Sequence, residues 1–181
     1  MRLFWRSGYE GVSIGDLTKA IGIAPPSLYA AFGSKAGLYK EALDCYERNF
    51  GSLELGGLEQ TTCLADAVRK LLEGAVHAVT HPDRETGCMI SGGMIAYHPD
   101  HAQLAQEAAA RRDAMRDRIA VALRPFASGT DTERLARYLS AVLQGISIQA
   151  RDGARPEDLQ EIVDDVVAGL EARPTRDRRP S

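Results

Sequence analysis

Two short helical patterns separated by a glycine, within residues 13–35, constrain this chain more than any other feature. The segment reads SIGDLTKAIGIAPPSLYAAFGSK. Ser13 is followed three residues later by Asp16, which is a capping-box pattern, and one helical face carries the apolar residues Ile14, Leu17 and Ile21. The segment therefore predicts a capped amphipathic helix that starts at Ser13.

A second short helix is expected after a turn at Gly22, because glycine tolerates the left-handed backbone that ends a helix. Pro25 and Pro26 suit a first helical turn, where an amide hydrogen is not needed, and Leu28 and Phe32 form a short buried edge. The N-terminal face of this helix would stay exposed. A helix held in this way against a preceding helix has the geometry that enters a DNA major groove.

A third helix is expected to begin at Ser34, with Lys35 in its first turn. A cation is unfavourable there because the N-terminal end of a helix is itself positive. An anion such as a DNA phosphate, bound by the free amides and the Lys35 ammonium, would offset this cost. The alternative is an ordinary solvated surface lysine.

This pattern resembles the TetR family of one-component transcriptional regulators through Ser13, Ile14, Leu17, Gly22, Leu28, Tyr29, Phe32, Ser34, Lys35 and Leu38. The resemblance implies an all-α homodimer with an N-terminal three-helix helix-turn-helix domain and a C-terminal helical domain that dimerises and binds an inducer. It also implies DNA-binding roles for six residues. Phosphates would be held by Ser13, Tyr29 and Lys35, and base edges would be faced by Pro25, Pro26 and Ser27.

The chain departs from the family pattern in three places. Ala24 stands where a hydroxyl cap is frequent, and Ala31 stands where a larger polar residue is frequent. The first helix is expected to be shortened, with residues 3–5 forming its C-terminal end and Gly8 its stop. We expect a helix-turn-helix domain over residues 1–45, a ligand-binding and dimerisation domain over 46–172, and a disordered basic tail over 173–181.

Charge and composition agree with a regulator that binds DNA through a local patch. The formal net charge of the 181 residues is −3, but residues 1–40 carry five basic side chains against two acidic ones. Cys45, Cys63 and Cys88 form no CxxC pair. No apolar run approaches the length of a membrane span and no secretory signal is visible, so the expected location is the cytoplasm.

The rest of the chain shows helical periodicity and no strand alternation. Helices are expected over residues 35–49, from 64 to near 82, over 87–97, and over 100–123. Two more follow, separated by the RDGARP segment of residues 151–156. These last two are apolar over a wide face, which predicts a four-helix bundle between two subunits, although burial within one subunit is the alternative. The expected interface comprises Leu135, Leu139, Val142, Ile146, Leu159, Ile162, Val163 and Val166.

A small-molecule inducer is expected to bind between the helices of residues 61–123, and GCMISGGMIAYHPDH is the best candidate segment. Methionines offer adaptable apolar surface and glycines allow close approach, although both also occur in ordinary packing. The expected lining residues are Cys88, Met89, Met94, Tyr97 and His77. A satisfied buried histidine is the alternative for His77.

Other chemistries have weaker support in the sequence. His98 and His101 are three residues apart, but they straddle Pro99 at a helix start, so a cap or surface role is favoured over a metal site. A redox-sensor role for Cys88 has equally weak support in the sequence. No phosphate-binding glycine loop, zinc-protease motif or nucleophile elbow is present.

We therefore expect no cofactor, no metal and no enzymatic activity. The expected function is a repressor that binds a palindromic double-stranded operator as a homodimer and is released by a small-molecule inducer. The alternatives are a helical dimerisation module without operator binding and a small helical enzyme.

Overall fold

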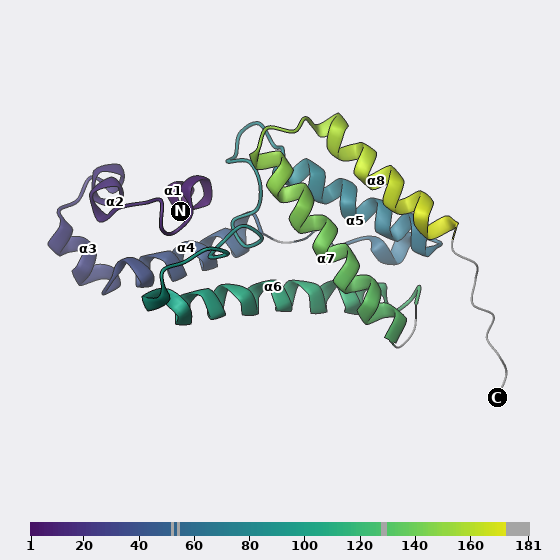
Figure 1. Cartoon of the computed structure of the whole chain (residues 1–181), viewed down its shortest axis with the longest axis horizontal. Helices are drawn as coiled ribbons and strands as arrows, with labels where there is room; N and C mark the ends of the chain where they lie inside the picture. Colours follow the sequence, from purple (N-terminus) through teal and green to yellow (C-terminus); the bar gives the residue numbers. More distant parts are fainter. Residues whose placement is uncertain (52, 54, 128–129, 173–181) are drawn as a thin grey trace.

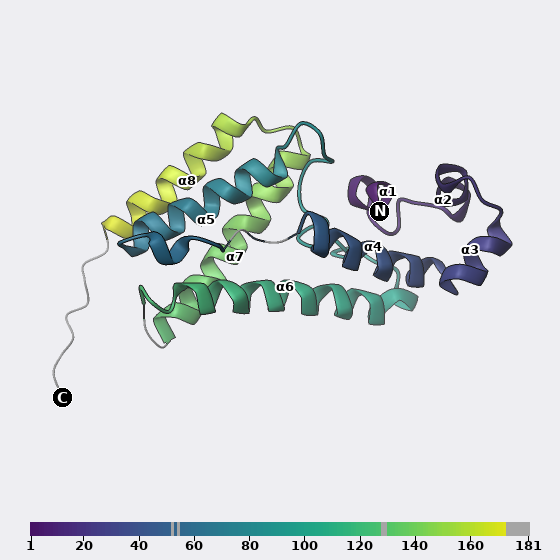
Figure 2. The same ribbon diagram turned by 180° about the vertical axis from the view of Figure 1, so that it is seen from behind.

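The computed structural model describes residues 1–51, 53, 55–127 and 130–172, and within this part of the chain the regular secondary structure consists of helices, with no strand. Helices α1 to α4 lie at one end of an elongated molecule, and α5, α7 and α8 form a bundle at the other end (Figure 1). The long helix α6 runs beneath both parts, and the view from behind shows the same arrangement (Figure 2). The all-α prediction is confirmed.

The N-terminal helices begin and end at the residues that the sequence indicates. Helix α1 spans Arg2–Ser7 and ends at Gly8, where φ is +70°. Helix α2 spans Ile14–Ile21, is capped by Ser13, and ends at Gly22 in the left-handed conformation with φ +79°. Helix α3 spans Pro25–Phe32, with both prolines in its first turn. The glycine turn thus joins two short helices as expected.

Helix α4, Lys35–Asn49, connects the N-terminal end of the molecule to the C-terminal bundle. It lies along α6, Ala102–Leu123, in both ribbon views. Arg111 of α6 pairs with Asp44 and Glu47 of α4, and Lys40 pairs with Glu107. These half-exposed ion pairs fix the register of the two helices more than they stabilise the fold.

The C-terminal bundle packs α5, Leu64–Val79, against α7, Thr130–Arg151, and α8, Pro156–Glu171. Its core contains the apolar stripes of all three helices together with Ile119 and Leu123 from the end of α6. Two short 3-10 helices complete the fold, η1 at Leu58–Gln60 and η2 at Pro99–His101. Over the described residues, no helix is long and apolar enough to cross a bilayer.

A second core lies under α1 to α4 and does not stop at the predicted domain boundary. It includes Phe4, Trp5, Leu28 and Tyr39 from the first four helices, and also Met89, Ile90, Met94, Leu104, Ala105 and Ala108 from later in the chain. Residue 45 itself lies inside α4. The described residues are therefore organised around two cores, and the core under α1 to α4 includes residues from 89 to 108.

The expected helix over residues 87–97 is wrong, because this segment forms a series of turns. Gly87 has φ +76° and Met94 has φ +54°, and neither value is helical. Side chains also bind its backbone carbonyls. Trp5 Nε1 donates to the Gly87 carbonyl at 2.9 Å, and Arg112 donates to the Gly93 carbonyl at 2.7 Å. These tertiary bonds replace helical ones, so apolar composition without a cap was a misleading helix signal here.

Candidate nucleic-acid interface and ligand cavity

The α2–α3 pair is held by local contacts that the sequence indicates. The Ser13 hydroxyl accepts from the Asp16 amide at 3.1 Å, and the Asp16 carboxylate accepts from the Ser13 amide at 2.9 Å, which completes the capping box. Ser13 Oγ also donates to the same carboxylate at 2.6 Å. Leu17 and Leu28 anchor the two helices because both are buried, Leu28 completely. The pair is therefore a capped, rigid unit.

The outer face of α3 is open to solvent. Leu28 is buried beneath it, whereas Pro25, Pro26, Ser27 and Tyr29 are exposed. All of the residues that were expected to face base edges therefore lie on an accessible face. Tyr29 is 48% exposed, a large fraction for an aromatic residue on a small helix. This face is free to contact a partner.

Free backbone amides lie beside this face. Helix α3 contributes none from its first two positions, because both are prolines. In α4, Ser34 Oγ accepts from the Gly37 amide at 3.0 Å, which leaves the amides of Lys35 and Ala36 without an acceptor inside the helix. The start of α4 can therefore bind a phosphate through two amides and the Lys35 side chain.

Lys35 does not extend freely into solvent. Its ammonium nitrogen lies 4.2 Å from the centre of the Tyr9 ring, which attracts it through a cation–π contact. Partial burial lowers the pKa of Lys35, and the nearby Glu10 carboxylate opposes that shift. The ammonium is thus held close to the start of α4, as a phosphate contact would require.

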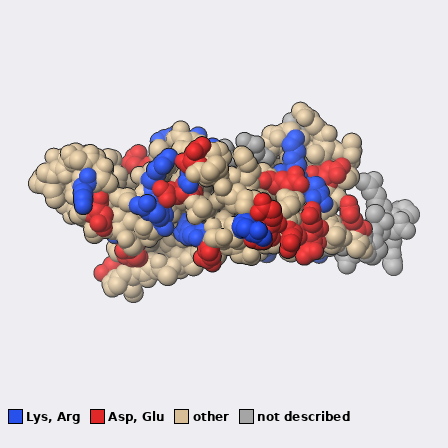
Figure 3. All heavy atoms as spheres, turned by 90° about the horizontal axis from the view of Figure 1, so that it is seen from above, with Lys and Arg blue, Asp and Glu red and all other residues tan. Residues whose placement is uncertain are grey.

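On the face that Figure 3 shows, acidic side chains are concentrated away from this end of the molecule. Figure 3 shows them gathered over the C-terminal bundle, with far fewer charges of either sign at the α2–α3 end. Carboxylates near a DNA contact surface would repel the phosphate backbone. The charge distribution therefore favours DNA approaching at the α2–α3 end.

A junction between the two ends of the chain was not predicted. Glu10, in the turn after α1, accepts from the His98 amide at 3.0 Å and lies 2.8 Å from His101 Nδ1. The His98 amide and then the His101 ring lower the pKa of the Glu10 carboxyl. The His101 ring packs edge-on against Tyr9, the residue that contacts Lys35. Because these residues are about ninety positions apart, no local sequence pattern could reveal the junction.

Both histidines of this junction make structural contacts. His98 Nδ1 accepts from the Asp100 amide at 3.4 Å and so caps η2, whereas His101 bonds Glu10. The expected cap role is thus observed for His98.

A cavity of about 240 Å³ lies between the end of α4 and the second half of α5, and we call it the α4–α5 cavity. Tyr46 and Phe50 form its α4 side, and Met115 of α6 and Leu143 of α7 contribute apolar walls. Of the five residues expected to contact a ligand, Cys88 and His77 line this cavity, and His77 is exposed rather than buried.

The other three expected ligand contacts lie elsewhere. Met89 and Met94 are buried in the N-terminal core, at 2% and 5% exposure. Tyr97 is 46% exposed and does not line the cavity. None of these three residues lines the α4–α5 cavity. Residues 87–97 form turns instead of the expected helix, and these turns place Met89 and Met94 in the core beside α4.

Cys88 and Tyr46 meet at the inner end of the cavity. The Cys88 amide donates to Ser147 Oγ at 2.8 Å, and its sulfur accepts from the Ser91 amide at 3.4 Å. Burial raises the pKa of the Tyr46 hydroxyl, and the neighbouring Cys88 adds to the shift. Tyr46 is therefore a neutral hydrogen-bonding group, and it links this cavity to α4.

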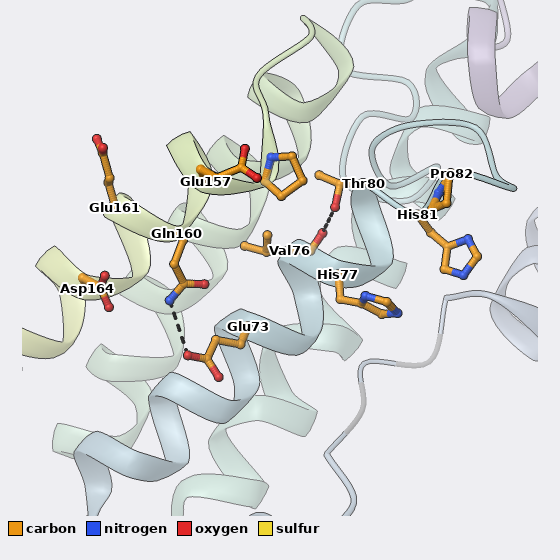
Figure 4. A pocket seen from close by; sticks show the side chains of 11 residues that line it. Glu73, Val76, His77, Thr80, His81, Pro82, Glu157, Gln160, Glu161 and Asp164 are labelled. Atoms are coloured by element: carbon orange, nitrogen blue, oxygen red, sulfur yellow. Dashed lines mark hydrogen bonds between the residues drawn. The ribbon is translucent and has the colours of Figure 1, made fainter.

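A second hollow is an open groove of about 600 Å³ between α5 and α8 (Figure 4). Carboxylates from both helices line it, and Glu73 accepts from Gln160 at 3.3 Å. In the close-up, the rings of His77 and His81 point away from the acidic side chains of α8. The two histidines line both hollows, so the acidic groove and the α4–α5 cavity lie back to back.

The expected dimer-interface residues are mostly inside one chain. The core of the bundle already buries Leu135, Leu139, Ile146, Leu159, Val163 and Val166, while Val142 and Ile162 are only partly buried. Since α5 covers the wide apolar faces of α7 and α8, the buried six have no surface left for a partner. The apolar residues that α7 exposes are Tyr138, Ala141 and Ile148.

Comparison with known proteins shows which class of protein this chain resembles. Residues 1–42 match the family model described as bacterial regulatory proteins, tetR family. The chain is 32% identical over 173 residues to the HTH-type transcriptional repressor ComR of Escherichia coli (strain K12), a match that covers 90% of this chain and 80% of ComR. The HTH-type transcriptional repressor BdcR of the same organism is 31% identical over 158 residues, covering 87% of this chain and 78% of BdcR.

Solved structures of similar fold point to the same class of protein. A cysteine mutant of the TetR family transcriptional regulator CifR, complexed with a 26-base-pair double-strand operator DNA, has a TM-score of 0.85 at 32% identity and covers 96% of this chain and 92% of its own. The fold and the exposed helix pair define a helix-turn-helix transcriptional regulator rather than an enzyme. The chain belongs to the TetR family.

Proposed function

We propose that this protein is a repressor that binds a palindromic operator as a homodimer and is released from it by a small molecule. The exposed face of α3, beside the free amides and Lys35 at the start of α4, carries the proposal. ComR and BdcR are described as repressors, and CifR is described in complex with operator DNA. The proposed location is the cytoplasm, where the operator is found.

The six DNA-contact residues keep their expected roles in this proposal. Tyr29 and Lys35 would hold phosphates together with Ser13, whose cap brings the start of α2 to the same surface. Pro25, Pro26 and Ser27 would face base edges. Only Ser27 among these three has a polar side chain, so the other two would contribute apolar contacts such as those made with the thymine methyl group.

A homodimer would form through the exposed faces of α7 and α8. Tyr138, Ala141 and Ile148 recur at helical spacing on the side of α7 that faces away from the core. Val142 of α7 and Ile162 of α8 are partly buried and could contribute to the same interface. Two copies related by a two-fold axis would place their α3 helices for successive major grooves, about one DNA turn apart.

A ligand in the α4–α5 cavity would act through α4. Tyr46 and Phe50 line the cavity near the C-terminal end of this helix, and Lys35 lies at its opposite end. A ligand that fits one tilt of α4 better than another shifts the population between two spacings of the α3 helices. This view keeps residues 1–45 as the DNA-binding region and residues 46–172 as the ligand-binding and dimerisation region.

The first test is selection of bound sequences from random double-stranded DNA at two salt concentrations. We expect a palindrome whose half-sites are about one DNA turn apart, with an affinity that falls steeply as salt rises. Enrichment of no sequence at either salt concentration contradicts the proposal and favours the dimerisation-module alternative.

Variants of Ser27 test the orientation of α3. Ser27→Gln should change the preferred base at the position that Ser27 faces, because glutamine favours adenine. Ser7→Gln is the matched control, since Ser7 is an exposed serine at the end of α1. An unchanged sequence preference for Ser27→Gln would show that this face of α3 does not read bases.

A further inference from the structure

The α4–α5 cavity has an apolar body. Phe50, Met115, Leu143 and Val79 contribute aromatic and aliphatic surface from four helices or their ends. Its volume of about 240 Å³ corresponds to about eight water molecules at ~30 Å³ each. This volume is slightly below the range of about 300–1,000 Å³ that is typical of small-molecule pockets, so it suits a short ligand.

The charged side chain that lines this cavity is positive. Arg84 lines it, and none of the described lining residues is an aspartate or a glutamate. The carboxylates of the acidic groove in Figure 4 line that groove and are not among the residues that line this cavity. A cationic ligand would therefore meet a like charge and would find no carboxylate among the described lining residues.

The Arg84 guanidinium has no hydrogen-bond acceptor among the described residues, unlike the guanidinium groups of three other partly buried arginines. Arg111 pairs with two carboxylates of α4, Arg112 donates to the Gly93 carbonyl, and Arg151 donates to the Trp5 carbonyl. The half-buried Arg84 guanidinium lies 5.3 Å from the centre of the Phe50 ring. It makes no side-chain hydrogen bond or ion pair with any described residue, although guanidinium carries five donors.

Further unused hydrogen-bonding groups face the same space. Ser91 is only 4% exposed and lines the cavity, yet its hydroxyl has no hydrogen-bond partner among the described residues. His77 adds an exposed imidazole, and its ring centre lies 5.4 Å from that of His81, whose Nδ1 accepts from the Asp83 amide at 3.3 Å. The Ser91 hydroxyl and the His77 ring, beside the Arg84 guanidinium, therefore offer donors to a ligand with acceptor atoms.

We propose that the α4–α5 cavity binds a small organic carboxylate. The Arg84 fork binds the planar carboxylate, for which its geometry is suited, and the short apolar body of the ligand packs against Phe50, Met115 and Leu143. The inference deepens the proposed function, because it names the chemical class of the inducer. A carboxylate bound to Arg84 would also change the contact between this side chain and the Phe50 ring. Because Phe50 lies at the C-terminal end of α4, this change would affect α4 directly.

The test uses the full chain without DNA, so that ligand binding is measured separately from operator binding. The probes are butanoate, hexanoate, octanoate and benzoate, titrated by calorimetry beside hexan-1-ol and hexylamine as neutral and cationic counterparts. We expect saturable binding of at least one carboxylate, and at least about tenfold weaker binding of the alcohol and the amine. Equal binding of hexanoate and hexan-1-ol overturns the proposal, and so does the absence of saturable binding for all four carboxylates.

A matched pair of variants tests Arg84 itself. Arg84→Met keeps a long side chain against Phe50 and removes the charge, and it should weaken carboxylate binding at least about tenfold. Arg124→Met removes an exposed charge at the end of α6, away from the cavity, and should leave binding unchanged. Equal carboxylate affinity of Arg84→Met and the unmodified chain overturns the role of Arg84. Thermal unfolding of both variants checks that they are folded.

Failure of this inference and failure of the proposed function give different results. A chain that selects a palindromic operator but binds no carboxylate retains the repressor proposal and loses the ligand class. A chain that binds carboxylates through Arg84 but enriches no DNA sequence retains the ligand site and loses the operator proposal. If both hold, the bound carboxylate should lower operator affinity, and Arg84→Met should abolish that effect.

Discussion

Lys35 has two neighbours that matter for its proposed role. The Tyr9 ring holds the ammonium 4.2 Å from its centre, and the start of α4 supplies free amides beside it. A phosphate placed there would interact with a preformed positive site rather than with a freely moving side chain. Tyr9 in turn contacts His101, so the geometry of this site depends on a residue at the start of the C-terminal half.

Replacing Lys35 by alanine tests the phosphate contact. We expect Lys35→Ala to weaken binding to all DNA sequences by about tenfold, and to reduce the slope of log affinity against log salt by about one. Fluorescence anisotropy over a range of salt concentrations measures both quantities. Arg124→Ala removes one charge from an exposed position remote from α3 and is the control. A change in sequence preference would contradict a pure phosphate contact.

The environment of Glu10 leads us to expect that the stability of the folded chain depends on pH. Hydrogen bonds from the His98 amide and the His101 ring lower the pKa of the Glu10 carboxyl in the folded chain. Its contribution to stability is therefore fully present above about pH 4.3, the ordinary value for an unfolded glutamate, and is lost as the pH falls through the lower folded value. The Glu10→Gln variant should be less stable than the unmodified chain at about pH 6 and should approach it near about pH 3.

Thermal unfolding of both chains across this pH range measures the effect. Glu41→Gln is the control, because Glu41 is an exposed glutamate of α4 without an ion pair in the described structure. A constant difference between Glu10→Gln and the unmodified chain at all pH values would show that the hydrogen bonds to Glu10 do not contribute.

At the scale of elements, the turns of residues 87–97 connect the two cores. Trp5 of α1 donates to Gly87, Arg112 of α6 donates to Gly93, and Ser147 of α7 accepts from the Cys88 amide. The Tyr39 hydroxyl of α4 is buried close to Gly93 and lacks a partner among the described atoms. This segment therefore contacts α1, α6 and α7 at once.

Gly93 is the position in this segment where a side chain does not fit. A Cβ atom there would lie 2.6 Å from the Met89 carbonyl oxygen and 2.8 Å from the Tyr39 hydroxyl. Gly93→Ala should lower the free energy of unfolding by about 1–3 kcal/mol, because the backbone must shift. Gly169→Ala in α8 meets no atom within 4 Å and should raise it by up to about 1 kcal/mol. Urea unfolding compares the two, and changes of the same sign would contradict the packing around Gly93.

At the scale of the whole molecule, the exposed face of α7 decides how two copies can associate. The stripes of α7 and α8 that the sequence marks as apolar are largely used within one chain, where α5 covers them. Ile148 is 45% exposed and lies on the opposite side of α7. An interface here would leave both α3 helices exposed at the far end of the molecule (Figure 1).

Ile148→Asp tests this interface. Burying an unpaired carboxylate is costly, so the variant should dimerise at least about tenfold more weakly than the unmodified chain. Val121→Asp places the same charge on α6, at a valine that is 54% exposed, and should leave the dimer intact. Sedimentation velocity over a range of concentrations measures both. An unaffected dimer for Ile148→Asp would place the interface on another face.

The sequence by itself determined the family and all of the longer helices, but not the turns of residues 87–97. Ser13, Gly22, Ser34 and the Gly153 turn act through their nearest neighbours, so local patterns located the ends of α2, α3, α4 and α7. Periodicity likewise identified the apolar stripes of α5, α7 and α8. Caps and stripes are properties of a few consecutive residues, which is why a single sequence is sufficient to find them.

Only the tertiary structure decided what each stripe packs against and where the polar groups meet. The buried face of α7 was assigned to a partner subunit because periodicity shows that a face is apolar, but not which neighbour covers it. The turns of residues 87–97 depend on donors from α1 and α6. Glu10 meets His101, and Arg84 faces Phe50, across long stretches of chain. Such pairs are set by the packing of whole helices, which no local pattern encodes.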